Sequence, residues 1–449
     1  MKNLTLSKIG ILILVVGTIT LSSCKKKGCT DPLANNYNEK AKKDDGSCTF
    51  DPEEPSTEER VSGTITANTT WTANMTYILD GKVVVDGGAT LTIEAGTIIK
   101  GEQGTGTNAS ALIVARGSKI NAAGTSSAPI IFTTVLDNIE MGQTSGTNLD
   151  ENDRGKWGGV IVLGYAKVSD ANGDTEGQIE GIPATDTYGT YGGSNDADNS
   201  GTISYVSIRH GGALIGAGNE INGLTLGGVG TGTTISNIEV LANVDDGIEF
   251  FGGSVNVSNA LVSYQGDDGI DIDQNYSGTV NNFMVVHGVD TDEALEIDGP
   301  EGSTYTTGSF TLSNGTIKSS DGIGSGADLK SAAQGDLTNI SWEGYSSNSI
   351  KFRASFSDTV NCTDKTDSYT NLIAGVLNVT SCEIAGSATI VDQVDVYTKS
   401  YIDSGNDICT DPLEATAEST VGATIVSAAT IGATVSSFSW TWSSINGKL

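Results

Sequence analysis

Short runs of alternating apolar and charged residues recur in the second half of the chain. The alternation has a period of two, which predicts β-strands with the apolar pair on one face and the charged residue on the other. Successive copies lie roughly 22 to 32 residues apart, the period range of stacked repeats. The copies are Ile248-Glu249-Phe250, Ile270-Asp271-Ile272, Leu295-Glu296-Ile297, the weaker Ala327-Asp328-Leu329, and Ile350-Lys351-Phe352.

Strands that repeat without a helix between them must stack in parallel, so the pattern predicts a parallel β-solenoid. Equivalent residues then lie one above another, about 4.8 Å apart. We therefore expect two charged columns on one outer face. The first is Glu249, Asp271, Glu296, Asp328 and Lys351, and the second is Asp273, Asp298, Lys330 and Arg353.

Short strands split by Gly, Asn or Ser turns begin at Val61. The phrases GATLTIEAGTIIKG, GSKINAAGTSSAPIIFTT and WGGVIVLG resemble the opening coils of right-handed parallel β-helix proteins of the pectin-lyase-like kind. The resemblance implies an all-β fold over residues 61–449. That span also resembles Bacteroidota outer-membrane or secreted lipoproteins. The aromatic stretch at 438–442 is expected to cap the last coil.

The first 23 residues predict a targeting segment, with Lys2 and Lys8 before a short apolar run. The run ends in Leu-Ser-Ser-Cys, which resembles a bacterial lipobox and implies lipidation of Cys24. Residues 24–28 would be the lipidated tether. An ordinary secretory signal is the alternative. The lipobox reading predicts an outer-membrane lipoprotein on the cell surface or the periplasmic face.

Residues 29–48 resemble a Cys-bracketed motif of surface proteins in Bacteroidota and some marine organisms. An oxidising compartment favours a disulfide between Cys29 and Cys48, and residues 49–60 have the composition of a linker. The oxygen-bearing side chains of this module suit calcium, and a loop of Asx turns is the alternative. The candidate ligands are Asp31, Asn36, Asn38, Asp44 and Asp45.

Three further cysteines lie near the C-terminus. Cys362 and Cys382 are predicted to pair, which leaves Cys409 without a partner. Because the number left after lipidation of Cys24 is odd, either one thiol is free or the pairing among these three differs.

The net charge of the chain limits the kinds of ligand that it can bind. The chain has 55 acidic and 24 basic residues, a net charge of −31, which excludes nucleic acid as a main partner and favours cations. Stacked carboxylates repel one another, and a divalent cation would relieve that repulsion. Calcium bridged by the columns is one hypothesis, and hydrated carboxylates are the other. The candidate ligands are Glu249, Asp271, Asp273, Glu296 and Asp298.

Three classes of function remain, one of which is a purely structural envelope protein that shows neither binding nor catalysis. The first is a lipid-anchored, non-catalytic module that binds a polysaccharide or an envelope protein, with Tyr188, Tyr191, Trp342 and Tyr345 as sugar-stacking candidates. The alternative rests on resemblance to β-helix polysaccharide lyases and glycoside hydrolases that act on acidic glycans. It implies calcium on the acids and a basic residue as the proton acceptor. The catalytic candidates are Lys330, Lys351 and Arg353.

Overall fold

The computed structural model describes residues 26–49, 57–216, 219–302, 304–320, 322, 324–358, 362–386, 389–398, 409 and 411–449. The expected signal peptide and Cys24 lie outside these residues. The chain divides into two compact units, Met1–Ser56 and Thr57–Leu449. Among the described residues, no helix is both long and apolar enough to cross a membrane.

The first unit is a small loop closed by the predicted disulfide between Cys29 and Cys48. Its chain is held by tight turns and by a parallel bridge between Lys27 and Lys43. A loop of this size needs the crosslink, because it buries little apolar surface.

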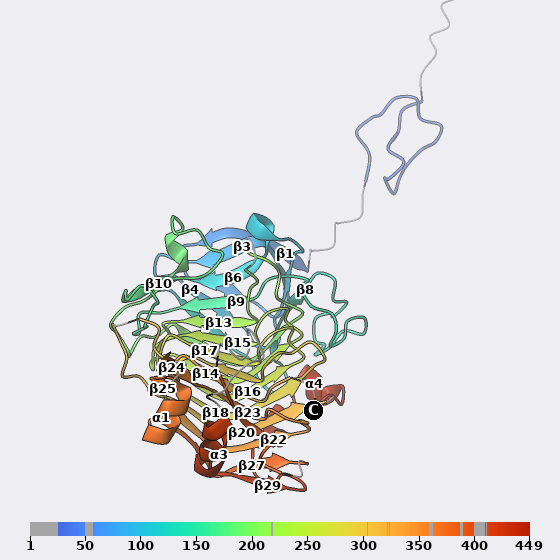
Figure 1. Cartoon of the computed structure of the whole chain (residues 1–449). Coiled ribbons are helices and arrows are strands. Elements are labelled where there is room, and N and C mark those ends of the chain that lie inside the picture. The colour runs from blue at the N-terminus through green and yellow to red at the C-terminus, as the bar shows by residue number, and fades with distance from the viewer. Residues whose placement is uncertain are drawn as a thin grey trace, which may run out of the picture. The chain divides into compact units, whose positions relative to one another are not determined.

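The second unit is a parallel β-helix (Figure 1), as the sequence predicts. Its first strand begins at Glu58, so the last residues of the expected linker belong to the rod. Each complete coil has three faces, and we call the face that carries the charged columns the first face. Its strands are parts of β1 (Glu58–Ile65) and β3 (Thr76–Val85), then β6 (Ala111–Val114), β9 (Val160–Leu163), β13 (Leu224–Gly227), β15 (Ile248–Phe251), β17 (Ile270–Asp273), β19 (Leu295–Ile297), β21 (Asp328–Leu329), β23 (Ile350–Arg353) and β28 (Val394–Tyr397).

The second and third faces are mostly two halves of one long strand, bent in the middle. The long strands are β12 (Gly201–Arg209), β14 (Thr234–Leu241), β16 (Asn256–Ser263), β18 (Thr279–His287), β20 (Phe310–Ser319) and β22 (Gly335–Glu343). At the two ends of the rod, the second face continues in β2 (Thr69–Trp71), β4 (Thr90–Ile93), β7 (Lys119–Ala123) and β26 (Leu377–Thr380). The third face continues in β5 (Ile98–Gly101), β8 (Ile130–Thr134), β27 (Cys382–Ala385) and β29 (Ala423–Val426).

Asparagines occupy the bend in successive long strands, each with a positive φ. Asn259 Nδ2 donates to Asn237 Oδ1 at 3.0 Å, and Asn282 Nδ2 donates to Asn259 Oδ1 at 2.6 Å. Asn tolerates this left-handed conformation better than other side-chain-bearing residues. The bend residues are Asn237, Asn259, Asn282, Asn314 and Asn339, with φ between 54° and 57°.

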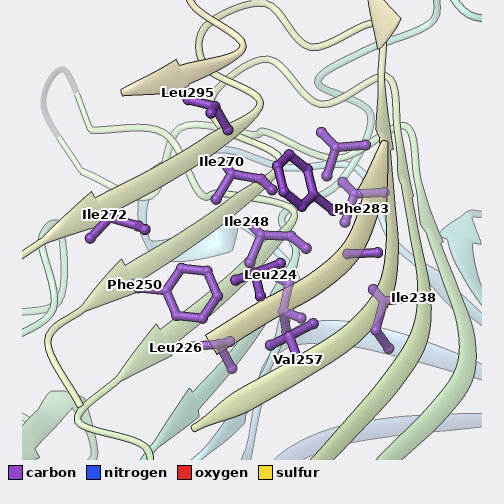
Figure 2. Close-up of a cluster of buried hydrophobic side chains, with 14 of the residues drawn as sticks. Leu224, Leu226, Ile238, Ile248, Phe250, Val257, Ile270, Ile272, Phe283 and Leu295 are labelled. Atoms are coloured by element: carbon purple, nitrogen blue, oxygen red, sulfur yellow. The ribbon is translucent and has the colours of Figure 1, made fainter. Parts of the chain in front are cut away.

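The inside of the coils is filled by stacked aliphatic and aromatic side chains (Figure 2). Leu224, Ile248, Ile270 and Leu295 are register partners on consecutive strands of the first face. Each is at most 1% exposed. The apolar half of the alternating pattern therefore forms the core, as predicted.

The C-terminal segment does not cap the last coil, so that prediction is wrong. Residues 430–449 instead run back along the outside of the third face, and we call them the strap. The last coils are covered by α3 (Asp411–Thr420), which places Ala417 in the core cluster. Inside the strap are η3 (Val435–Phe438) and α4 (Trp442–Ile445).

The remaining elements are α1 (Ser368–Ala374), η1 (Gly106–Asn108), η2 (Thr187–Gly189) and two hairpins, β10 (Glu176–Gln178) with β11 (Thr190–Gly192) and β24 (Ser355–Asp358) with β25 (Thr363–Lys365).

The predicted pair Cys362–Cys382 is also wrong. Cys362 pairs with Cys409, across a Cα–Cα distance of 5.5 Å. Cys382 is a free, buried thiol that lies on β27 and points into the core, where it is 2% exposed. A strand residue that faces the core cannot reach a loop cysteine outside the coil.

Candidate cation-binding cleft

The first charged column lies in register on the first face, as the sequence predicts. Glu249 is the register partner of Asp271, and Asp271 of Glu296. The first column continues through Asp328 and Lys351 and ends at Asp395, which the sequence analysis did not include.

A second set of carboxylates comes from the turn that precedes each strand of the first face. Asp246 Oδ1 accepts the backbone N–H of Asp268 at 3.0 Å, and Asp268 Oδ1 accepts that of Glu293 at 2.7 Å. Gly247 follows the first of these acids because a Cβ there would lie 2.3 Å from Val262 Cγ1 in the core. The repeated Asp-Asp-Gly at 245–247 and 267–269 is the sequence signal for this set, which the predicted calcium ligands do not include.

Two loops, one between β10 and β11 and one between β12 and β13, form a wall beside these carboxylates. Together they line a cavity of about 340 Å³ that we call the acidic cleft. Glu249 is only 8% exposed and Asp271 6%, so the hypothesis of fully hydrated carboxylates is wrong for them. The two loops supply Ile179, Glu180, Ile215, Asn219, Glu220, Ile221 and Asn222. The turns and strands supply the other acids, Asp245, Asp246, Glu249, Asp267, Asp268, Asp271, Asp273 and Glu296.

Carboxylate oxygens converge in three groups among the described residues, each within 4.8 Å. The groups are Asp245, Asp246 and Asp267; Asp246, Glu249 and Asp271; and Asp268, Glu293 and Glu296. Two buried oxygens in the acidic cleft have no hydrogen-bond partner, Asp271 Oδ1 and Asn222 Oδ1. Buried polar atoms are rarely left unpaired, so these two point to a missing positive partner.

Burial and mutual repulsion raise the pKa of these carboxyl groups. Burial, followed by the charge of Asp267, raises the pKa of Asp245 to about 6. Burial, followed by the charge of Asp246, raises the pKa of Asp268 to about 11. The same causes raise the pKa of Glu249 and Asp271 well above ordinary values. The ionised form is therefore costly unless a cation is close.

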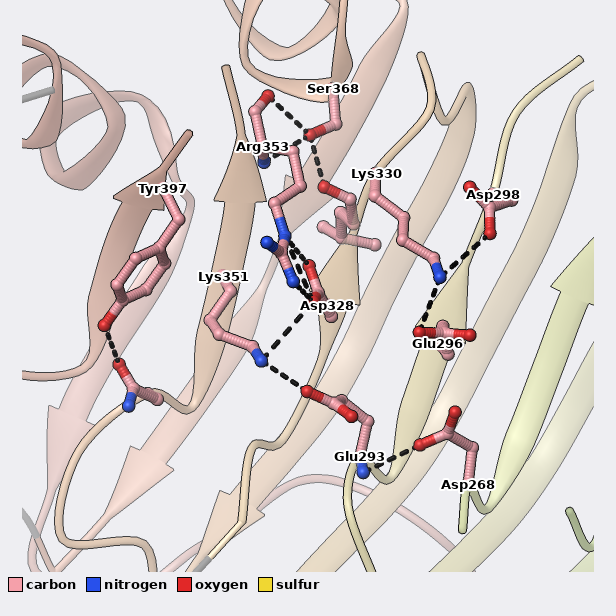
Figure 3. Close-up of polar contacts among 12 residues, drawn as sticks. Asp268, Glu293, Glu296, Asp298, Asp328, Lys330, Lys351, Arg353, Ser368 and Tyr397 are labelled. Carbon is pink, nitrogen blue, oxygen red and sulfur yellow. Dashed lines mark hydrogen bonds and ion pairs between the residues drawn. The ribbon is translucent and has the colours of Figure 1, made fainter. Parts of the chain in front are cut away.

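The C-terminal part of the first face carries its own cations (Figure 3). Lys330 Nζ lies 2.6 Å from Glu296 Oε1 and 3.3 Å from Asp298 Oδ2. Lys351 bridges Glu293 and Asp328, and the Arg353 guanidinium also bonds Asp328.

These ion pairs bear on the catalytic hypothesis. Burial alone would lower the pKa of Lys330, but the charges of Asp298 and Glu296 outweigh it and the net pKa is raised. For Lys351, Asp328 and Glu293 outweigh burial in the same way. A general base must be free of its proton, and these amines hold theirs. The arrangement does not favour Lys330, Lys351 or Arg353 as a proton acceptor.

Four of the five calcium ligands expected in the first unit make Asx turns. Asp31 Oδ1 accepts the N–H of Leu33, Asn38 Oδ1 that of Lys40, and Asp44 Oδ1 that of Gly46, at 2.9 to 3.1 Å. Asp45 likewise accepts from Ser47, and Asn36 accepts from Thr49. This is the geometry of the alternative reading, and calcium binding in this unit remains a prediction.

Comparison with known proteins agrees with the architecture. The sequence profile of the family described as "Pectate-lyase like beta helix domain" matches residues 63–442. No curated protein and no solved structure matches the chain. The matched span covers the rod from its first coil to the strap, and the chain therefore belongs to the pectate-lyase-like β-helix family.

Proposed function

We propose that this protein is a non-catalytic binding module of the cell envelope and that its acidic cleft binds calcium. The observation that carries the proposal is the buried, unpartnered Asp271 Oδ1 within a group of three converging carboxylates. No Lys or Arg is among the described residues that line the acidic cleft. Glu296 pairs with Lys330 at the edge of the cleft, and an external cation is the remaining source of positive charge for Asp246, Glu249 and Asp271.

Calcium fits the donor set better than other common metals. The cleft offers carboxylate oxygens and the Asn222 amide oxygen, and its described lining residues include neither histidine nor cysteine. Calcium takes six to eight oxygens in flexible geometry, whereas zinc prefers nitrogen and sulfur.

The sequence also suggests where in the cell the protein acts. A lipidated Cys24 would tether the rod to the outer membrane, as in the Bacteroidota lipoproteins that the chain resembles. A rigid rod on a tether suits capture of a polysaccharide or an envelope protein. The ion-paired state of Lys330 and Lys351 supports binding over lyase chemistry.

Calcium titration of the purified protein tests the proposal. We expect saturable binding in calorimetry, and we expect Asp271→Asn and Glu249→Gln each to weaken it by at least about tenfold, or 1.4 kcal/mol. Glu140→Gln, at an exposed glutamate outside the cleft, is the matched control and should bind like the native protein. Equal binding by all four proteins would refute the acidic cleft as the site.

A second substitution tests the idea that lysine replaces calcium farther along the face. Lys330→Met leaves Glu296 and Asp298 without their ammonium partner. Glu296 belongs with Asp268 and Glu293 to the third carboxylate group, so we expect one additional bound calcium per chain by atomic emission after dialysis. An unchanged calcium count would mean that Lys330 does not occupy a cation position.

A further inference from the structure

A second, larger cleft lies beside the acidic cleft, with a volume of about 820 Å³. Three loops and β3 form it, and Ile215 lines both clefts. We call it the tyrosine cleft. Its described lining residues are Lys82, Thr105, Gly106, Thr107, Gly181, Pro183, Asp186, Tyr188, Leu214, Ile215 and Gly216.

The loops of the tyrosine cleft are held in place by hydrogen bonds. Gln178 Nε2 donates to the backbone oxygens of Ile182, Pro183 and Asp186 at 3.2 to 3.3 Å. This single amide fixes the loop that carries the cleft residues. A cleft formed before its ligand arrives costs less conformational entropy on binding.

A second tie joins the loops to one another. The N–H of Gly106 donates to Leu214 O at 2.7 Å. Gly181, with φ +70°, packs so closely that a Cβ there would lie 2.3 Å from Ile215 Cγ2. Both contacts fix the width of the tyrosine cleft.

The lining combines an aromatic ring with one group of each charge. The half-buried Tyr188 donates its hydroxyl to Asp186 Oδ2 at 2.9 Å, and Asp186 Oδ1 accepts a longer hydrogen bond from Thr185 Oγ1 at 3.5 Å. Lys82 Nζ donates to Gly106 O at 3.1 Å. The exposed parts of Pro183 and Leu214 are apolar.

We propose that the tyrosine cleft binds a neutral saccharide. A sugar ring has an apolar C–H face that can stack on an aromatic ring, and hydroxyl groups around its edge that bond to carboxylates and amines. The charges of Lys82 and Asp186 balance, so nothing in the described lining selects an acidic sugar. Three of the four aromatic candidates from the sequence, Tyr191, Trp342 and Tyr345, are at most 5% exposed.

This site stands apart from calcium, because Asp186 is the one carboxylate among its described lining residues. The test is calorimetry of the full chain with cellohexaose, laminarihexaose, chitohexaose and mannohexaose, each in EDTA. We expect at least one of them to bind at one site per chain. Failure of calcium to bind the acidic cleft would leave this result unaffected, since the assay contains no free calcium.

Substitutions in the tyrosine cleft test whether the saccharide binds there. Tyr188→Ala and Asp186→Asn should each weaken binding by about tenfold or more. Tyr37→Ala, at an exposed tyrosine of the other unit, should leave it unchanged, and melting curves confirm that each variant is folded. The proposal is overturned if none of the four sugars binds, if binding requires calcium, or if both cleft variants bind as tightly as the native protein.

Discussion

Glu239→Gln is expected to lower the melting temperature by about 4 to 6 °C. Glu239 is completely buried on β14, and its Oε2 lies 3.7 Å from Nη2 of the equally buried Arg209. Loss of one member of a buried ion pair costs about 3–5 kcal/mol, because the other charge stays buried without a partner. In a rod of this length, each kcal/mol corresponds to roughly 1.2 °C.

The same carboxylate anchors the strap. It accepts the backbone N–H groups of Trp442 at 3.0 Å and Ser443 at 2.9 Å, and the Ser443 hydroxyl at 3.0 Å. Ser207 donates to it as well, at 2.6 Å. The substitution therefore weakens a contact between residues about 200 positions apart.

The strap follows one outward-facing column of the third face, coil by coil. Near its start, Thr430 bonds Glu383, and Ala433 N donates to Thr316 Oγ1 at 2.9 Å. Phe438 then packs in one cluster with Leu261 and Met284. The column in register order is Ser207, Glu239, Leu261, Met284, Thr316, Ser341 and Glu383. The strap thus ties the last coils to much earlier ones.

Glu383→Gln provides a matched control from the other end of the same column. Glu383 also accepts hydrogen bonds from the strap, at Thr430, but it lies at the solvent-accessible surface, where water replaces a lost partner. Thermal denaturation followed by circular dichroism compares the two variants. Equal shifts for Glu239→Gln and Glu383→Gln would contradict the idea that the buried anchor dominates.

The repeating part of the fold could be predicted because neighbours in space are equivalent positions in sequence. The pairing of Glu249 with Asp271 and Glu296 follows from a single alternating pattern. The bend asparagines carry a comparable signal, since Ser-Asn or Thr-Asn precedes an apolar residue in three of the six long strands, at Asn237, Asn259 and Asn339. Register within a solenoid is thus a local property.

The contacts that depend on single, non-repeating segments could not be predicted. Burial of Asp271 is imposed by two loops whose residues carry no coil pattern, so the sequence pattern predicted a solvated, outward-facing strand position. The strap is a comparable case, because its aromatic residues suit any apolar surface, whether at the end of the rod or along its side. The partner of Cys362 is likewise decided by where Cys409 lies, and nothing repeats there.

The acidic cleft should make stability depend on pH in a direction opposite to that of ordinary salt-bridged acids. Its carboxyl groups hold their protons more tightly in the folded chain than in the unfolded chain, where their pKa is near 4. This contribution to stability is complete below about pH 4 and declines as pH rises through the folded pKa. The stability contributed by Asp245 is lost as the pH rises to its pKa of about 6. The stability contributed by Asp268 continues to fall toward its pKa of about 11.

In EDTA, we therefore expect the melting temperature to fall as the pH is raised from about 5 to about 8. Each carboxyl that keeps its proton only in the folded state contributes about 1.4 kcal/mol per pH unit. Calcium at about a hundred times its dissociation constant should restore about 2.7 kcal/mol and flatten the slope, because it stabilises the ionised carboxylates. Asp271→Asn should give a shallower decline in EDTA and a smaller response to calcium. A melting temperature that rises across this range in EDTA would mean that the buried acids are already ionised in the folded protein, and the cleft would then have no need of a cation.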